Sequence, residues 1–385
     1  MARHALRHSR APAPSDDVRA TGHAEEEMPR VVFTRRRLFG FGLFVVSSIA
    51  FLYFVLPKIV GLHDAWDRIS HGDVSWLVVG ACLEVLSFCG YVALFRAVFV
   101  KAAGAASTPV RASRIDWAAS YEITMAGLAA TRLFATAGAG GVALTAWAVR
   151  RSGMDGRIVA CRMIAFLALL YGVYMATFVI DGLGLWFGIL AGPAPFAITV
   201  VPAIFGAVVI GTFLAVSLLP GDAERLVGRW TSGEGRLGRV ARRVALAPAA
   251  AATGIRTAIS LVRTRDPSLL GAIGWWGFDI ATLWACFHAF GGSPPTAVIV
   301  MAYFVGMLGN TLPLPGGIGG VEGGMIGAFS AFGVPVEIAV PSVLAYRVFA
   351  FWLPTLPGAI AYLQLRRTVQ RWRADPERAT QATSV

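Results

Sequence analysis

Charged residues are scarce in this chain, and lysine is nearly absent. They make up 15% of the 385 residues, and Lys58 and Lys101 are the only lysines. The four cysteines show no CxxC spacing, the six histidines form no HExxH pattern, and neither a GxxxxGK[ST] nor a GxSxG motif occurs. These absences exclude the P-loop ATPases and the hydrolases that carry such motifs. We therefore predict no enzyme activity, no metal site and no cofactor.

Apolar residues, by contrast, are abundant. They account for 56% of the chain, and the mean hydropathy is +0.64. This is far more apolar side chain than one soluble core requires, so the composition predicts an all-α polytopic membrane protein. The net charge of +12 comes almost wholly from arginines between apolar segments, as in the cytoplasmic loops of membrane proteins. No nucleic-acid recognition motif accompanies the charge, so we predict no nucleic-acid partner.

The order of apolar and arginine-rich segments predicts three parts. Residues 1–34 form a disordered cytoplasmic tail, residues 35–367 a transmembrane domain, and residues 368–385 a second cytoplasmic tail. Residues 220–267 of the domain form a cytoplasmic basic amphipathic loop. We expect about eight transmembrane helices and two short broken or re-entrant helices. A bacterial inner membrane, with both termini cytoplasmic, is the expected location. The first span is placed at 38–60, further spans include 115–136 and 296–312, and the short helices are placed at 142–149 and 321–332.

Two glycine-rich stretches interrupt the apolar pattern. Residues 312–324 contain two prolines and six glycines, which no continuous helix tolerates. Backbone groups left unpaired at membrane depth need burial by protein or contact with water, so this break predicts a cavity. The pattern GxGGV at residues 317–321 also occurs at residues 138–142. Because breaks at matching points of two halves are typical of inverted-repeat transporters, we predict an inverted repeat with the substrate site between its halves.

Two arginines within predicted spans lie close in sequence to these breaks. They are Arg132 and Arg347. A guanidinium in the membrane requires an anionic partner. One alternative is a phosphate, whose oxygens fit the planar guanidinium fork, and the other is an internal pair with Glu122, Glu84 or Glu322. An ion pair that opens when a lipid phosphate competes combines the two alternatives.

The acidic residues within predicted spans offer further chemistry. Glu322 begins the short helix after the second break, where the helix dipole favours its charge. Its alternatives are binding a cationic or hydroxylated headgroup, proton coupling, or capping of that helix. Glu84, Glu122 and Asp279 are candidates for charge partners or for proton coupling. Tyr346 adds a neutral hydrogen-bonding group near the second break.

Several motifs in this chain resemble a known family. Four motifs resemble the closing half of the lysylphosphatidylglycerol synthase transmembrane family, namely residues 312–322, Gly333-Val334-Pro335, Tyr346-Arg347 and residues 353–358. That family includes the flippase domain of the multiple peptide resistance factor and stand-alone relatives. Residues 132–141, followed by Arg150-Arg151, resemble its first-half glycine motif. One departure is Ala143, which stands where an acidic residue would match Glu322.

The resemblance covers residues 38–367 and implies a helical protein that moves lipids with modified headgroups, such as aminoacylated phosphatidylglycerol, between leaflets. We expect no lipid synthesis, because no counterpart of the soluble aminoacyl-transferase domain is recognisable. The residues assigned to a lipid-headgroup cavity are Arg132, Gly138, Gly140, Gly141, Pro313, Pro315, Gly316, Gly317, Gly319, Gly320, Glu322, Tyr346 and Arg347.

The sequence therefore predicts a membrane lipid translocase whose partners are membrane phospholipids. One alternative is a non-catalytic subunit that presents a lipid to a separate lipid-modifying transferase. Another is a transporter of small solutes or ions. The sequence leaves open the headgroup, the direction and energy coupling of transport, and whether the chain forms a homo-oligomer.

Overall fold

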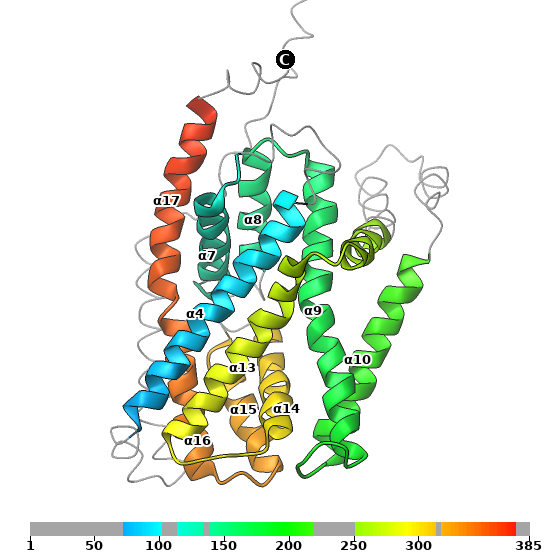
Figure 1. Cartoon of the computed structure of the whole chain (residues 1–385), viewed down its shortest axis with the longest axis vertical. Helices are drawn as coiled ribbons and strands as arrows, with labels where there is room; N and C mark the ends of the chain where they lie inside the picture. The colour runs from blue at the N-terminus through cyan, green and yellow to red at the C-terminus, as the bar shows by residue number, and fades with distance from the viewer. Residues whose placement is uncertain (1–71, 102–113, 134–138, 219–250, 313–316, 375–385) are drawn as a thin grey trace, which may run out of the picture. The chain divides into compact units, whose positions relative to one another are not determined.

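The computed structural model describes residues 72–101, 114–133, 139–218, 251–312 and 317–374. They all fall within one compact unit, and every regular element among them is helical (Figure 1). The all-α fold class is confirmed. The predicted tail 1–34, the predicted first span 38–60 and most of the loop 220–267 lie outside the described residues. The last helix continues to Ala374, past the predicted end of the membrane domain at residue 367.

Five helical segments in the described parts of the chain are long and apolar enough to cross a membrane, for which about 20 residues are needed. They establish a multi-pass membrane protein. The segments are α4 (Val74–Arg96) with its π-helical extension Ala97–Lys101, α9 (Gly156–Trp186), α10 (Phe196–Ser217), α13 (Gly271–Ala289) with the preceding turn Pro267–Leu270, and α16 (Val336–Arg347) joined through Val348–Trp352 to α17 (Thr355–Ala374).

Four shorter helices form two hairpins. The first consists of α7 (Trp117–Leu133) and α8 (Ala139–Arg151). The second consists of α14 (Thr296–Met307), which the 3-10 helix Leu308–Thr311 continues, and α15 (Gly320–Ala331). In Figure 1 the first hairpin lies toward the upper end of the view and the second toward the lower end. At the span predicted over 296–312 the structure has an apolar helix over 296–311, which is shorter than the five candidate spans and whose α-helical part pairs with the 12-residue α15.

Glycines allow the helices of each hairpin to approach closely. A Cβ atom on Gly141 of α8 would overlap the side chain of Thr131 and the backbone of Gly127 on α7. A Cβ atom on Gly309 would likewise overlap the backbone at Gly320, the first residue of α15. The described residues of both GxGGV copies, 139–142 and 317–321, lie at the start of the second helix of a hairpin. The inverted repeat itself stays a prediction.

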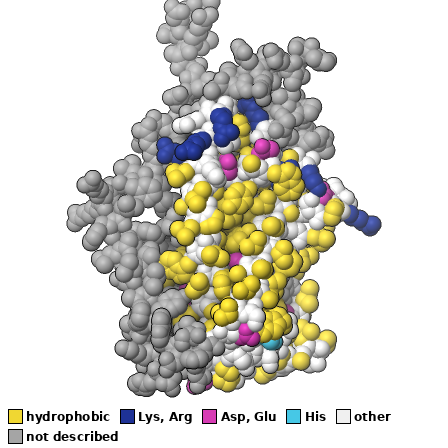
Figure 2. All heavy atoms as spheres, turned by 60° about the vertical axis from the view of Figure 1, so that its left-hand side comes forward, with side chains coloured by type: hydrophobic (Ala, Val, Ile, Leu, Met, Phe, Trp, Pro, Cys, Tyr) yellow, Lys and Arg dark blue, Asp and Glu magenta, His cyan; other side chains and the backbone are white. Residues whose placement is uncertain are grey.

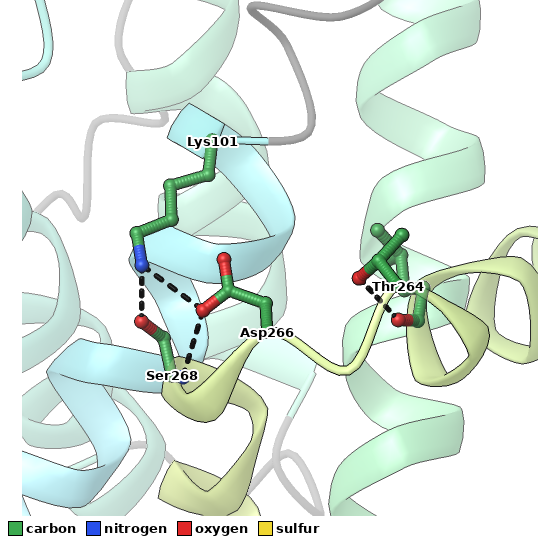
Figure 3. Close-up of polar contacts among 5 residues, drawn as sticks. Lys101, Thr264, Asp266 and Ser268 are labelled. Carbon is green, nitrogen blue, oxygen red and sulfur yellow. Dashed lines mark hydrogen bonds and ion pairs between the residues drawn. The ribbon is translucent and has the colours of Figure 1, made fainter.

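The two hairpins are held beside a tightly packed pair of spanning helices, α4 and α13. Ser87 of α4 donates a hydrogen bond of 2.8 Å to the carbonyl of Trp275 on α13. At the end of the pair, the Lys101 ammonium donates to Asp266 at 3.0 Å and to the Ser268 hydroxyl, as Figure 3 shows. These contacts fix the register of α4 on α13.

The outer surface is strongly apolar. Figure 2 shows one face with a broad band of apolar side chains and with lysine and arginine gathered above it. On α10 the exposed side chains include Ile204, Phe205 and Val208. An apolar band bounded by basic residues at one end fits helices whose arginine-rich ends lie at one membrane surface.

Candidate functional site

Both hairpins border one cavity of about 820 Å³, which is large enough for a small organic headgroup. The first hairpin contributes residues from α7 and α8, and the second contributes residues of Leu308–Thr311 after α14 and Gly317 before α15. Helices α4, α9, α13 and α16 complete the wall. The polar residues that line the cavity are Thr124, Thr131, Arg132, Thr145, Asp279, Asn310, Thr311, Tyr346 and Arg347.

On the side of the second hairpin, Arg347 and Glu322 form a buried ion pair. The Arg347 Nε donates to the Glu322 carboxylate at 2.7 Å, and the two residues are 5% and 2% exposed. The other carboxylate oxygen accepts the backbone N–H of Gly319 at 2.7 Å, so Glu322 also caps α15. Among the alternatives given above, the structure therefore contains the internal ion pair for Arg347 and the helix cap for Glu322. Arg347 lines the cavity, and Glu322 stands behind it.

On the side of the first hairpin, Arg132 lies near the end of α7 and lines the same cavity. Its Nη1 atom is buried and has no hydrogen-bond partner among the described residues. The guanidinium carbon lies 5.8 Å from the ring centre of Phe88 and 5.9 Å from that of Phe351. Such rings stabilise a cation but supply no hydrogen-bond acceptor. Arg132 therefore brings a positive charge with unused donor capacity to the cavity.

A third group of polar residues lies between α4 and α13. Asp279 of α13 is 4% exposed, and its Oδ2 accepts the Tyr303 hydroxyl at 2.6 Å. Glu84 of α4 is 1% exposed and is close enough to Asp279 for a hydrogen bond between the two carboxyl groups. The Tyr346 hydroxyl, buried beside them, has no hydrogen-bond partner within the described parts of the chain. Two carboxyl groups thus lie next to Arg132 at the edge of the cavity.

The structure brings some of the residues assigned from sequence to this cavity and leaves others aside. Glu122 of α7 does not line it, although its Oε2 is buried without a partner among the described residues. Four of the assigned residues lie outside the described residues, namely Gly138, Pro313, Pro315 and Gly316. Gly140, Gly319, Gly320, Glu322 and Glu84 are close to the wall without lining it, while Arg132, Gly141, Gly317, Asp279, Tyr346 and Arg347 line it.

Sequence reasoning missed the aromatic wall and one buried acid. Tyr171 and Tyr174 lie one helical turn apart on α9, a spacing of three that could have revealed a shared face. The acid is Asp181, which is 7% exposed. It was missed because it directly follows a long apolar run and so resembles a residue beyond the end of a span, whereas α9 continues to Trp186. The other aromatic residues of the wall are Tyr91, Phe95, Phe166, Trp275, Trp276 and Phe351.

Metal binding finds no support in the part of the chain that the structure describes. No group of three or more histidine, cysteine, aspartate or glutamate side chains is placed there to hold an ion. With arginines in the wall, the cavity instead combines cationic donors, a few hydroxyl groups and aromatic surface. That combination suits an anionic group attached to an apolar body.

These features define the protein as a multi-pass helical membrane protein in which two interrupted hairpins meet at an arginine-lined cavity. The chain belongs to the family described as lysylphosphatidylglycerol synthase TM region, whose model matches residues 38–358. The match includes both hairpins, and the resemblance noted from the motifs is thereby confirmed.

Archaeal relatives match shorter segments. A UPF0104 membrane protein of Methanothermobacter thermautotrophicus is 35% identical over 109 residues, which cover 28% of this chain and 31% of the relative. UPF0104 membrane proteins of Methanocaldococcus jannaschii and Pyrococcus horikoshii are 32% and 31% identical over 95 and 106 residues, covering 24% and 27% of this chain. The matched segments span about a third or less of each relative, 31%, 28% and 32% in turn. Because these relatives are archaeal, a bacterial inner membrane stays a prediction.

Proposed function

We propose that the protein is a non-enzymatic lipid translocase that binds the phosphate of a phospholipid headgroup in this cavity. The observation that carries the proposal is the buried Nη1 of Arg132, which reaches a cavity shared by both hairpins and has no partner among the described residues. A buried guanidinium donor without an acceptor is costly to maintain, so an anionic ligand is the natural partner.

Phosphate is favoured over a simple halide because its oxygens accept two parallel hydrogen bonds from one guanidinium. It is favoured over a carboxylate, which can bind in the same way, because the membrane offers phosphodiesters at high local concentration. The second arginine of the wall, Arg347, is already paired with Glu322 at 2.7 Å. In this proposal Arg132 receives the phosphate first, and the Glu322–Arg347 pair opens when the headgroup moves deeper.

The aromatic and apolar wall supports a lipid rather than a free solute. Tyr171 is 48% exposed although it also lines the cavity, so apolar surface continues from the cavity to the outside of the helices. A headgroup can then occupy the cavity while its acyl chains stay in the bilayer, which avoids the cost of dragging the chains through a polar interior. The aminoacylated phosphatidylglycerol implied by the family is one lipid that this arrangement accommodates.

The proposal can be tested in vesicles that contain the purified full-length chain. The measurement is the rate at which fluorescent phosphatidylglycerol moves between the two leaflets. We expect wild-type protein to move the lipid and Arg132→Ala to reduce the rate by about tenfold or more, since a hydrogen bond to a charged group contributes about 1.5–3 kcal/mol. Arg96→Gln is the matched control. Arg96 also lies at a helix end, but it donates to Ser120 at 2.9 Å, stacks over Trp117, and does not line the cavity.

The same vesicles separate the alternatives. A subunit that only presents lipid to a separate transferase would move no lipid by itself. A solute transporter would take up a solute at a rate independent of the lipid headgroup. Near wild-type lipid movement by Arg132→Ala, with the protein correctly inserted, would exclude Arg132 from the site and remove the main support for the proposal.

A further inference from the structure

Two buried carboxyl groups face each other across the α4–α13 pair, and each has one oxygen without a hydrogen bond among the described residues. The Oε2 of Glu84 and the Oδ1 of Asp279 are both buried, and neither has a hydrogen-bond donor among the described residues. The side chains are nevertheless within hydrogen-bonding reach of each other. Two ionised carboxylates at this separation repel, whereas a single proton held between them gives each group a partner.

The packing around the pair keeps the two groups together. Glu84 lies one turn after Gly80, whose carbonyl accepts the Thr282 hydroxyl of α13 at 3.2 Å. On the far side, the Tyr303 hydroxyl donates to the Oδ2 of Asp279 at 2.6 Å. The Thr282 bond therefore holds α4 and α13 in register beside the pair, and the Tyr303 bond holds the Asp279 carboxyl group in place.

We propose that Glu84 and Asp279 form a proton-binding site whose occupancy is linked to the binding of a phosphodiester at Arg132. This inference rests on the proposed function and adds to it the identity of the coupling ion. The proton comes from water that reaches the cavity, and it is released to water when the anion leaves. The carboxyl O–H bond is the only bond that forms, and it breaks again on release.

The charges that face the pair explain the linkage. Arg132 of α7 stabilises both carboxylates, and Arg347 of α16 is largely balanced by Glu322. With Glu84, Asp279 and Glu322 ionised, these five side chains carry one excess negative charge. A phosphodiester bound at Arg132 adds further negative charge and withdraws the stabilising cation from the pair. The pair therefore holds a proton more readily when the anion is bound, and proton uptake accompanies anion binding. The other titratable groups that face the pair are Tyr303 of α14, Tyr346 of α16 and Cys286 of α13.

Calorimetry on the full-length protein in detergent tests this linkage. The probe is a short-chain phosphatidylglycerol, because its phosphodiester does not itself titrate near neutral pH, and any protons exchanged belong to the protein. Titrations in two buffers of different ionisation enthalpy give the number of protons taken up per bound lipid. We expect uptake of up to about one proton and a Kd that increases by up to about tenfold per pH unit over part of the range from about pH 5 to pH 9.

Conservative variants locate the proton. In Glu84→Gln and Asp279→Asn the pH dependence of Kd and the proton uptake should be lost or greatly reduced. Binding itself should persist in Glu84→Gln, because Glu84 does not line the cavity. Asp181→Asn is the matched control, because Asp181 is 7% exposed and its Oδ2 also lacks a partner among the described residues, but it does not line the cavity. It should retain the wild-type pH dependence.

The outcomes distinguish this inference from the proposed function. Wild-type protein that binds and moves the lipid with no proton uptake and a constant Kd overturns the proton site and leaves the translocase standing. Wild-type proton uptake that persists in the Glu84→Gln/Asp279→Asn double variant also overturns the site. If the wild type binds no phosphodiester at all, both proposals fail. A parallel titration with the tail-free glycerophosphoglycerol headgroup identifies the source of the anion, because a lipid site binds the short-chain lipid more tightly.

Discussion

The buried pair of Glu322 and Arg347 allows a quantitative test of how the second hairpin is held. Replacing Glu322 by Gln removes the charge that faces Arg347 across 2.7 Å but keeps an oxygen that can accept the Gly319 N–H. The variant therefore separates the ion pair from the helix cap. Replacing Arg347 by Met removes the other charge and preserves much of the apolar stem.

The expected magnitude follows from burial. Both residues are no more than 5% exposed, so either single change leaves an uncompensated charge or an unsatisfied donor in an almost fully buried site. Breaking a buried pair in this way costs about 3–5 kcal/mol. The double variant buries neither charge, so it should be more stable than the sum of the two single effects by about 2–3 kcal/mol.

The assay is unfolding in mixed micelles at increasing denaturing detergent, followed by the fluorescence of the 11 tryptophans. The exposed pair Lys101–Asp266 provides the control, because their side chains are 51% and 25% exposed and such pairs contribute about 1 kcal/mol or less. Strict additivity of Glu322→Gln and Arg347→Met would refute the reasoning. So would a coupling no larger than that of the exposed pair.

Two further predictions concern packing and pH. Gly309→Ala should destabilise the protein by about 1–3 kcal/mol in the same unfolding assay, because the new Cβ atom would overlap the backbone at Gly320. Gly323→Ala is the control and should be neutral or slightly stabilising, because a Cβ atom there has no neighbour within 4 Å. Equal effects of the two changes would contradict the close hairpin contact. The Ser268 N–H and the Lys101 ammonium lower the pKa of Asp266 in the folded protein. The ionised Asp266 carboxylate therefore stabilises the fold fully above its unfolded pKa of about 3.9, and this stabilisation is lost as the pH falls through the lower pKa of the folded state. Thermal unfolding of Asp266→Asn should therefore differ from wild type at neutral pH and converge with it in acid; a difference that is constant with pH would exclude this linkage.

The sequence was most informative about features that depend on local composition. The break at 312–324 was predicted from its glycines and prolines, and α15 indeed begins at Gly320 with Glu322 as its capping residue. Helix capping was among the alternatives for Glu322 because a carboxylate at that position is favoured by the nearby N–H groups alone. The extent of the helices was less predictable, as α14 shows, because an apolar run has the same composition whether it spans the membrane or turns back.

Pairing between side chains could not be predicted. Three acids were open as partners of the two arginines, and the structure pairs Arg347 with Glu322, 25 positions away in sequence. The contact between Glu84 and Asp279 depends on how α4 and α13 are rotated about their axes, which helices as uniformly apolar as these do not encode in a simple pattern. Asp181 escaped notice for a related reason, since the end of α9 is set by a turn beyond the apolar run.

By itself, the sequence determined that this protein lies in a membrane, that it is helical, and where its backbone is interrupted. Those properties follow from hydropathy and from the backbone restrictions of proline and glycine, both of which act within a few residues. Only the tertiary structure decided that both interruptions border one cavity, that Arg347 is paired while a donor of Arg132 is left over, and that two carboxyl groups meet beside it. These outcomes depend on helix packing, which brings together side chains that are far apart in the chain and decides which charges are buried together.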